Sequence, residues 1–131
     1  MYTIDEVNDM LDDIADEIPQ ALFQDLNGGI VLLEECEAHP ESQGDLFILG
    51  QYRHRYDMGR SICIYYGSFM QIYGYLPKEQ LKEKLKETLL HEFTHHWESL
   101  AGEKDLEIED AIQMYQYRQR KANIHQHKKG E

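Results

Sequence analysis

The residues with the clearest chemical potential are two histidines separated by three residues, with a glutamate directly after the first: His91, Glu92 and His95. On a helix, residues i and i+4 lie one turn apart on the same face, so both imidazole rings can reach one tetrahedral metal ion. The glutamate beside the first histidine can contact a water on that metal without binding the metal itself. The spacing therefore predicts a zinc site with His91 and His95 as ligands and Glu92 as general base.

The position of this motif on its helix distinguishes a metal pair from two packed core histidines. The surrounding segment, about 78–101, is expected to form one long helix, because a proline precedes it and a glycine follows it. On an ideal helical wheel its large apolar side chains fall in one stripe: Leu81, Leu85, Leu89, Phe93, Trp97 and Leu100. His91 and His95 fall at about 280° and 320° from Leu81, roughly opposite that stripe. They are therefore expected to face away from the core, with Glu92 at the edge of the stripe.

The third histidine of the run, His96, falls at about 60° on the same wheel, within the apolar stripe. A histidine in that position packs in the core or supports the site through a hydrogen bond. We therefore expect a packed or supporting His96 rather than a third ligand.

A catalytic zinc needs a third protein ligand and an open position for water. Gly102 lets the chain turn back after the helix, and Asp105, three residues later, is our preferred third ligand. Glu98 is the rival, because it lies on the histidine face near His95. Weaker candidates follow in the next segment: Glu107, Glu109 and Asp110.

The elements that must position this helix are short. A helix is expected over 3–18, with a good N-cap at Thr3 and the capping-box partner Glu6 three residues on. Apolar runs at 30–33, 46–52 and 61–66 predict three strands, with a polar loop over 37–45 and a turn over 53–60. A short helix is expected between Gly67 and Gly74, and a final helix over about 104–121.

This order predicts one α+β domain over residues 1–122, with a disordered tail over 123–131. The expected architecture is a small mixed or antiparallel sheet of about three strands. It is accompanied by an N-terminal helix, the motif helix and a C-terminal helix.

Composition narrows the possible partners and compartment. The chain has 25 Asp and Glu against 13 Lys and Arg, a formal net charge of −12. Such a surface repels phosphate groups, so we expect neither nucleic acid nor an anionic membrane as a partner. Cys36 and Cys63 lie far apart and suggest no disulfide framework, and the start of the chain lacks the pattern of a signal peptide. A cytoplasmic protein is expected.

The run Leu90-His91-Glu92-Phe93-Thr94-His95-His96 resembles the motif of small, single-domain, zincin-like metallopeptidases of bacteria, sometimes called minimal metalloproteases. The resemblance extends over about 3–110. Its other parts are Glu17-Ile18-Pro19, Leu49-Gly50-Gln51-Tyr52, Arg60, and Ile62-Cys63-Ile64-Tyr65-Tyr66-Gly67. The Gly-x-x-Asp element at 102–105 comes about one helical turn later than in that family, about 5.4 Å along the axis.

The resemblance implies a minimal zincin-like fold and a zinc-dependent peptidase acting on a peptide or protein substrate. It carries over His91, Glu92 and His95 as site residues, and Asp105 at the shifted position. In the implied mechanism zinc activates a water, and Glu92 takes its proton and passes it to the leaving amine.

Further groups are expected to assist. Candidates for stabilising the oxyanion, by position alone, are Tyr52, Arg60, Tyr65 and Tyr66. The strand 61–66 is a candidate sheet edge on which a peptide could add a strand.

Two other classes of function stay open. One is a catalytically inactive zinc-binding protein-interaction module, and the other is a plain interaction domain in which the motif is accidental. Structural zinc sites are usually closed and cysteine-rich, which favours the catalytic interpretation here.

Overall fold

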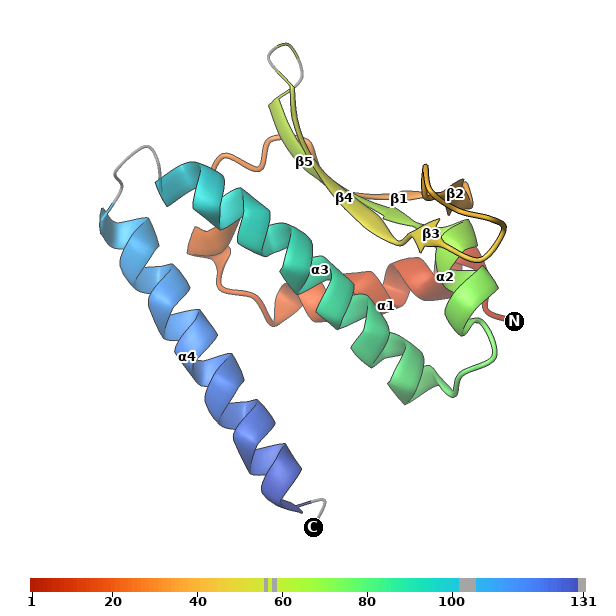
Figure 1. The fold of residues 1–131 in the computed structure, drawn as a ribbon. Coiled ribbons are helices and arrows are strands. Elements are labelled where there is room, and N and C mark those ends of the chain that lie inside the picture. Colours follow the sequence, from red (N-terminus) through yellow and green to blue (C-terminus); the bar gives the residue numbers. More distant parts are fainter. Residues whose placement is uncertain (56, 58, 102–105, 130–131) are drawn as a thin grey trace.

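The computed structural model describes residues 1–55, 57, 59–101 and 106–129, with the side chains of 106–109 and 123–129 excepted. The described elements form an α+β fold in which helices pack beneath a small sheet (Figure 1). The predicted fold class is confirmed. No helix among the described residues is long and apolar enough to cross a bilayer.

Helix α1 (Ile4–Asp16) begins with the predicted capping box. The backbone N–H of Glu6 donates to Thr3 Oγ1 at 3.2 Å, and Glu6 Oε1 accepts from the backbone N–H of Thr3 at 3.0 Å. The helix ends two residues before the expected limit, at Asp16. Ile18 is nevertheless buried, and Pro19 caps a 3₁₀ turn, η1 (Gln20–Phe23), that the sequence analysis missed.

The main sheet is mixed, with strand order β1-β5-β4. Strand β1 (Gly29–Leu33) runs parallel to β5 (Gly59–Tyr65), and β4 (Gly50–Arg55) runs antiparallel to β5. The predicted turn over 53–60 is shorter than expected, because β4 extends to Arg55 and pairs there with Gly59. Strand β5 is central, with its core side chains buried, so the expectation that 61–66 forms a sheet edge is wrong.

The expected strand over 46–52 is divided between two sheets. Strand β3 (Phe47–Ile48) pairs with β2 (Glu37–Ala38), which falls in the predicted loop over 37–45. The chain then passes through Leu49 into β4, and the Leu49 carbonyl accepts a hydrogen bond from the Tyr65 N–H. A two-residue pairing of exposed residues such as β2 has no hydrophobic periodicity, so no sequence pattern predicts it.

Three helices complete the chain: α2 (Tyr66–Tyr73), α3 (Lys78–Ala101) and α4 (Leu106–Lys129). Helix α3 has the predicted limits. Helix α4 continues through Lys129, in place of the tail expected to be disordered from 123, since no glycine or proline interrupts the segment before Gly130.

The core lies between α3, α1 and the sheet. All six apolar residues of the predicted α3 stripe are buried. The rings of Phe93 and Phe23 pack edge to face with their centroids 5.1 Å apart, and Trp97 Nε1 donates to the Leu22 carbonyl at 3.2 Å. These contacts anchor the middle of α3, where the motif lies, against η1.

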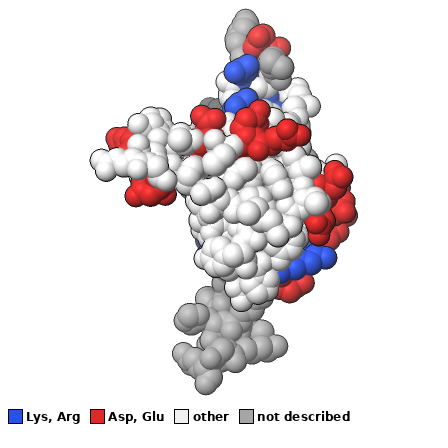
Figure 2. All heavy atoms as spheres, turned by 90° about the vertical axis from the view of Figure 1, so that its right-hand side faces the viewer, with Lys and Arg blue, Asp and Glu red and all other residues white. Residues whose placement is uncertain are grey.

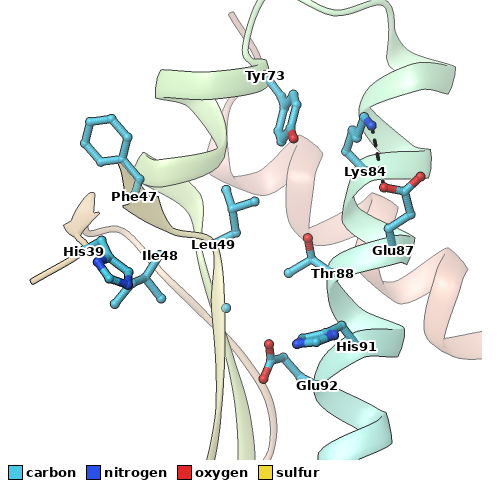
Figure 3. A pocket seen from close by; sticks show the side chains of 11 residues that line it. His39, Phe47, Ile48, Leu49, Tyr73, Lys84, Glu87, Thr88, His91 and Glu92 are labelled. Atoms are coloured by element: carbon cyan, nitrogen blue, oxygen red, sulfur yellow. Dashed lines mark ion pairs between the residues drawn. The ribbon is translucent and has the colours of Figure 1, made fainter. Parts of the chain in front are cut away.

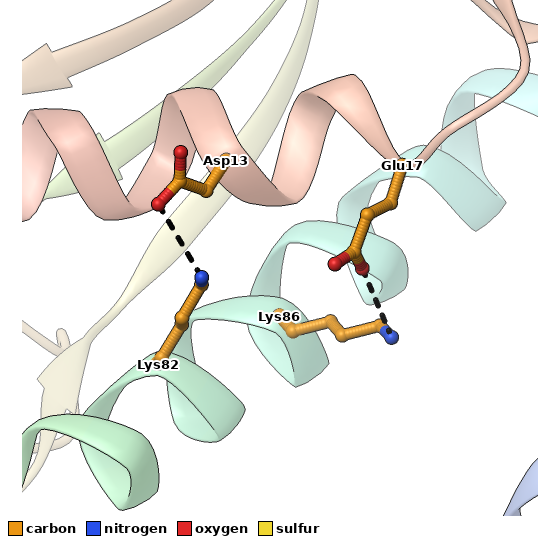
Figure 4. Close-up of polar contacts among 4 residues, drawn as sticks. All are labelled: Asp13, Glu17, Lys82 and Lys86. Atoms are coloured by element: carbon orange, nitrogen blue, oxygen red, sulfur yellow. Dashed lines mark hydrogen bonds and ion pairs between the residues drawn. The ribbon is translucent and has the colours of Figure 1, made fainter.

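Ion pairs at the surface also join α3 to α1 and to Glu17, the residue that caps the end of α1 (Figure 4). Lys82 contacts Asp13 at 3.4 Å, and Lys86 contacts Glu17 at 3.7 Å. Exposed pairs of this kind contribute about 0–1 kcal/mol each, so apolar packing is the larger contribution to holding α3 in place.

Candidate metal centre and its groove

The two motif histidines lie on the solvent side of α3. His91 and His95 are exposed, and their ring centroids are 4.9 Å apart with the rings edge to face. Glu92, between them in sequence, is buried at 7% exposure. The structure thus places the three side chains as the helical wheel predicts.

A groove runs between α3 and the strands β3 and β4. One cavity of about 650 Å³ is lined by residues 50–53 of β4 together with His91, Glu92 and His95. A second cavity of about 390 Å³ extends along α3 and shares Gly50, His91 and Glu92 with the first (Figure 3). Because the two cavities share these residues, we treat them as one α3–β4 groove with the motif at its centre.

Strand β4 approaches α3 closely at Gly50, the first residue of the strand. A Cβ added to Gly50 would lie 3.1 Å from Thr88 Cγ2 and 3.2 Å from the Cys63 carbonyl oxygen. Such contacts are tight, so a glycine allows the strand to approach α3 closely at this point. The approach brings the start of β4 beside Glu92.

His96 is a buried histidine that supports the groove from behind, as the wheel predicts. Its Nε2 lies 2.9 Å from the Gln24 carbonyl oxygen, and its Nδ1 lies 2.9 Å from the Tyr52 hydroxyl. Burial lowers the pKa of His96, and the charge of Arg60 lowers it further, against the opposing effect of the Gln24 hydrogen bond. The neutral form is therefore favoured.

The tautomer of His96 determines the role of Tyr52. A carbonyl oxygen can only accept, so Nε2 of the neutral ring carries the proton and Nδ1 is an acceptor. The Tyr52 hydroxyl must then donate to Nδ1. With that proton committed, the Tyr52 hydroxyl is not a donor for a substrate oxygen, which argues against its predicted oxyanion role.

The other predicted oxyanion candidates are not among the residues that line the groove. The Tyr65 hydroxyl donates to Gln51 Oε1 at 2.8 Å and accepts from Arg53 Nη2 at 3.0 Å. The Tyr66 hydroxyl donates to the Tyr2 carbonyl, and Arg60 is buried. These three side chains stabilise the fold around the site.

The described candidates for a third metal ligand do not join the histidine pair. Glu98 is exposed and lines a different cavity, between α3 and α4, while Asp110 is exposed on α4. Asp105 lies outside the described residues, as do the side chains of Glu107 and Glu109. Within the described ranges no three His, Cys, Asp or Glu residues form a group that could hold a metal ion.

The side chains in the groove nevertheless match part of a zinc site. Two exposed imidazoles one helical turn apart are the kind of pair that binds zinc, and a buried carboxylate stands beside them in the same groove. The described residues could thus supply two metal ligands, His91 and His95, and one general base, Glu92.

His39, which is not among the residues predicted from the sequence, also lines the groove, on the side opposite α3 (Figure 3). Its Nδ1 accepts the backbone N–H of Glu41 at 3.1 Å. In that tautomer Nε2 carries the proton, so His39 has one donor available for a ligand in the groove. The only sequence signal was a histidine in a polar loop, which has no defined spacing to the motif.

Comparison with solved structures finds similarity to a conserved hypothetical protein from Thermus thermophilus, with a TM-score of 0.66 and 30% sequence identity. The similarity covers 78% of this chain and 100% of that chain. The two proteins belong to one family. No protein-family model matches the chain. No curated protein matches it either.

Proposed function

We propose that this protein is a zinc-dependent metallopeptidase of the zincin-like class, with His91 and His95 as metal ligands. The observation that carries the proposal is the shared groove: two exposed histidines one turn apart open into the same cavity as the buried Glu92. Asp105 remains our proposed third ligand. We further propose a cytoplasmic enzyme that acts on a peptide or protein substrate.

Zinc, when bound, lowers the pKa of a coordinated water to about 7 and polarises the scissile carbonyl. The Glu92 carboxylate then accepts a proton from the attacking water and delivers it to the leaving amine nitrogen. His39, through Nε2–H, is our candidate donor to the substrate carbonyl oxygen, since the predicted tyrosines are committed elsewhere.

Strand β4 takes over the role that the sequence analysis assigned to 61–66. It is an outer strand of the sheet and lines the groove beside the motif. An extended peptide can bind such an edge by adding a strand, which would bring a peptide bond beside Glu92.

The second candidate is a zinc-binding interaction module without turnover. The observation that favours it is that the described residues supply only two of the ligands. Both candidates require zinc, so catalysis must be tested separately from metal binding.

The first experiment measures zinc per chain by mass spectrometry for wild type, His95→Ala and the control His54→Ala, an exposed histidine of β4 outside the groove lining. We expect about one zinc in wild type and the control, and loss of zinc in His95→Ala. A chain that binds no zinc would refute both candidates.

The second experiment tests turnover on a peptide library. Glu92→Gln is expected to retain zinc and to lose cleavage by a factor of about 10² or more, and His39→Ala to lose a smaller factor. Zinc binding with no cleaved peptide in wild type would favour the interaction module.

A further inference from the structure

The part of the groove beyond Glu92 has a lining unlike that of the metal end. Its walls opposite α3 are apolar or aromatic and half-buried, formed by Phe47, Ile48 and Leu49 together with Tyr73 of α2. Its volume of about 390 Å³ lies in the range of small-ligand pockets, which are mostly apolar with few polar groups. We call this part the side pocket.

The α3 wall of the side pocket is a row of residues at helical spacing. Glu92, Thr88 and Lys84 occupy positions four residues apart, so they extend about 12 Å along the helix axis. The row begins at the proposed general base. A side chain that enters beside Glu92 therefore passes Thr88 and the apolar walls before it reaches Lys84.

An ion pair lies at the far end of the side pocket (Figure 3). Lys84 Nζ lies 3.6 Å from Glu87 Oε2 and 5.6 Å from the centre of the Tyr73 ring. Because the two charges of this pair are opposite and adjacent, the far end offers no net charge to a basic or an acidic side chain. Either would also lose hydration against the apolar walls.

We propose that the side pocket binds an uncharged apolar side chain, of leucine or phenylalanine size, from the substrate residue beside the scissile bond. The inference rests on the proposed peptidase function and adds a substrate class to it. It follows from the apolar walls, the compensated charge at the far end and the continuity of the pocket with Glu92.

The test measures binding without turnover. Zinc-supplemented, ¹⁵N-labelled full-length Glu92→Gln is titrated with acetylated, amidated alanine-based hexapeptides in which one position is Phe, Leu, Glu or Lys. Dissociation constants come from the shifts of backbone amide signals. We expect the Phe and Leu peptides to bind about tenfold more tightly than the Glu and Lys peptides, with shifts at Leu49 and Thr88.

A charge placed in the wall should reverse this preference. Ile48→Lys, added to Glu92→Gln, is expected to favour the Glu peptide over the Phe peptide, because the new ammonium group lies in the pocket wall. The matched control is Val31→Lys, which alters an exposed β-branched residue on β1 and should leave the preference unchanged. Thermal unfolding confirms that each variant is folded.

Equal affinities for all four peptides, no saturable binding of any peptide, or an unchanged preference in folded Ile48→Lys would overturn the side-pocket proposal. Failure of the peptidase function is recognised separately, from zinc content and from cleavage by wild type. If the chain binds no zinc but still prefers the apolar peptides, the side-pocket proposal is supported and the peptidase function is refuted.

Discussion

At the scale of single residues, the neighbouring histidines of the motif differ in burial, and the difference gives them different functions. His95 is exposed in the groove, whereas His96, the next residue, is fully buried and hydrogen-bonded at both ring nitrogens. A helical step of about 100° is enough to move a side chain from solvent to core. The same imidazole group is thus available for a metal in one case and is a structural hydrogen-bonding group in the other.

The buried His96 predicts a pH dependence of stability. Its pKa is lowered in the folded chain, so in mildly acidic solution the unfolded chain binds more protons than the folded chain. The free energy of unfolding is therefore expected to be fully retained above the ordinary histidine pKa of about 6.5, and to fall as the pH decreases from there toward the lowered folded pKa.

Urea unfolding of zinc-free protein between pH 5 and pH 8 measures this effect. Relative to wild type, His96→Asn should show a smaller loss of unfolding free energy on acidification, while its stability at pH 8 falls because a buried hydrogen bond is disturbed. The control His39→Asn, at an exposed histidine that does not contribute to the lowered pKa of His96, should follow wild type. Equal slopes for His96→Asn and wild type would contradict the assignment.

At the scale of elements, α1 and α3 form the layer that packs against the sheet, and this packing positions the motif on α3. Helix α1 buries Val7, Met10, Leu11 and Ile14, and its start is fixed by the capping box at Thr3. The same box lowers the pKa of Glu6, since the carboxylate accepts a hydrogen bond from the Thr3 backbone. A stable start of α1 therefore supports α3 indirectly.

Thr3→Ala is expected to reduce the free energy of unfolding by about 1 kcal/mol, the usual effect of losing an N-cap. The site lies on another helix, so zinc content should not change. Urea denaturation of Thr3→Ala and Thr3→Ser measures the difference, with serine as the variant that retains a cap. A loss as large in Thr3→Ser as in Thr3→Ala would show that the hydroxyl cap is not the cause.

At the scale of the whole molecule, acidic residues outnumber basic ones by 25 to 13. Figure 2 shows Asp and Glu around the rim of one face, with few Lys and Arg and a broad uncharged area between them. The net charge of −12 produces a field that attracts cations over a Debye length of about 8–10 Å. The side pocket selects a local side chain, whereas this field acts on the net charge of the whole substrate.

The field predicts a salt effect on substrate capture. For peptides with the same apolar residue at the scissile bond, kcat/KM should be several-fold higher for a peptide of net charge +3 than for a neutral one at low ionic strength. The advantage should shrink as NaCl rises from about 20 to 300 mM, with little change for the neutral peptide. A salt-independent ratio would show that local contacts, not the field, distinguish the two peptides.

The match between sequence and structure is uneven for a physical reason. The limits of α3, the burial of its stripe and the exposure of His91 and His95 follow from periodicity within one helix, and the structure reproduces them. The capping box is equally local. The errors concern pairing between distant segments: β5 is central instead of an edge, and β2 pairs with β3. The extension of α4 is a different error, since a polar composition was taken for disorder.

The sequence by itself therefore determined the helical motif, the face on which its histidines lie and the α+β class, because these depend on neighbours within a turn or two of chain. Only the tertiary structure decided that β4 borders the motif, that His39 lines the same groove, and that Tyr52 donates to His96 across 44 positions of sequence. Those contacts depend on which strands pair and which surfaces are buried together, and short-range periodicity does not specify either.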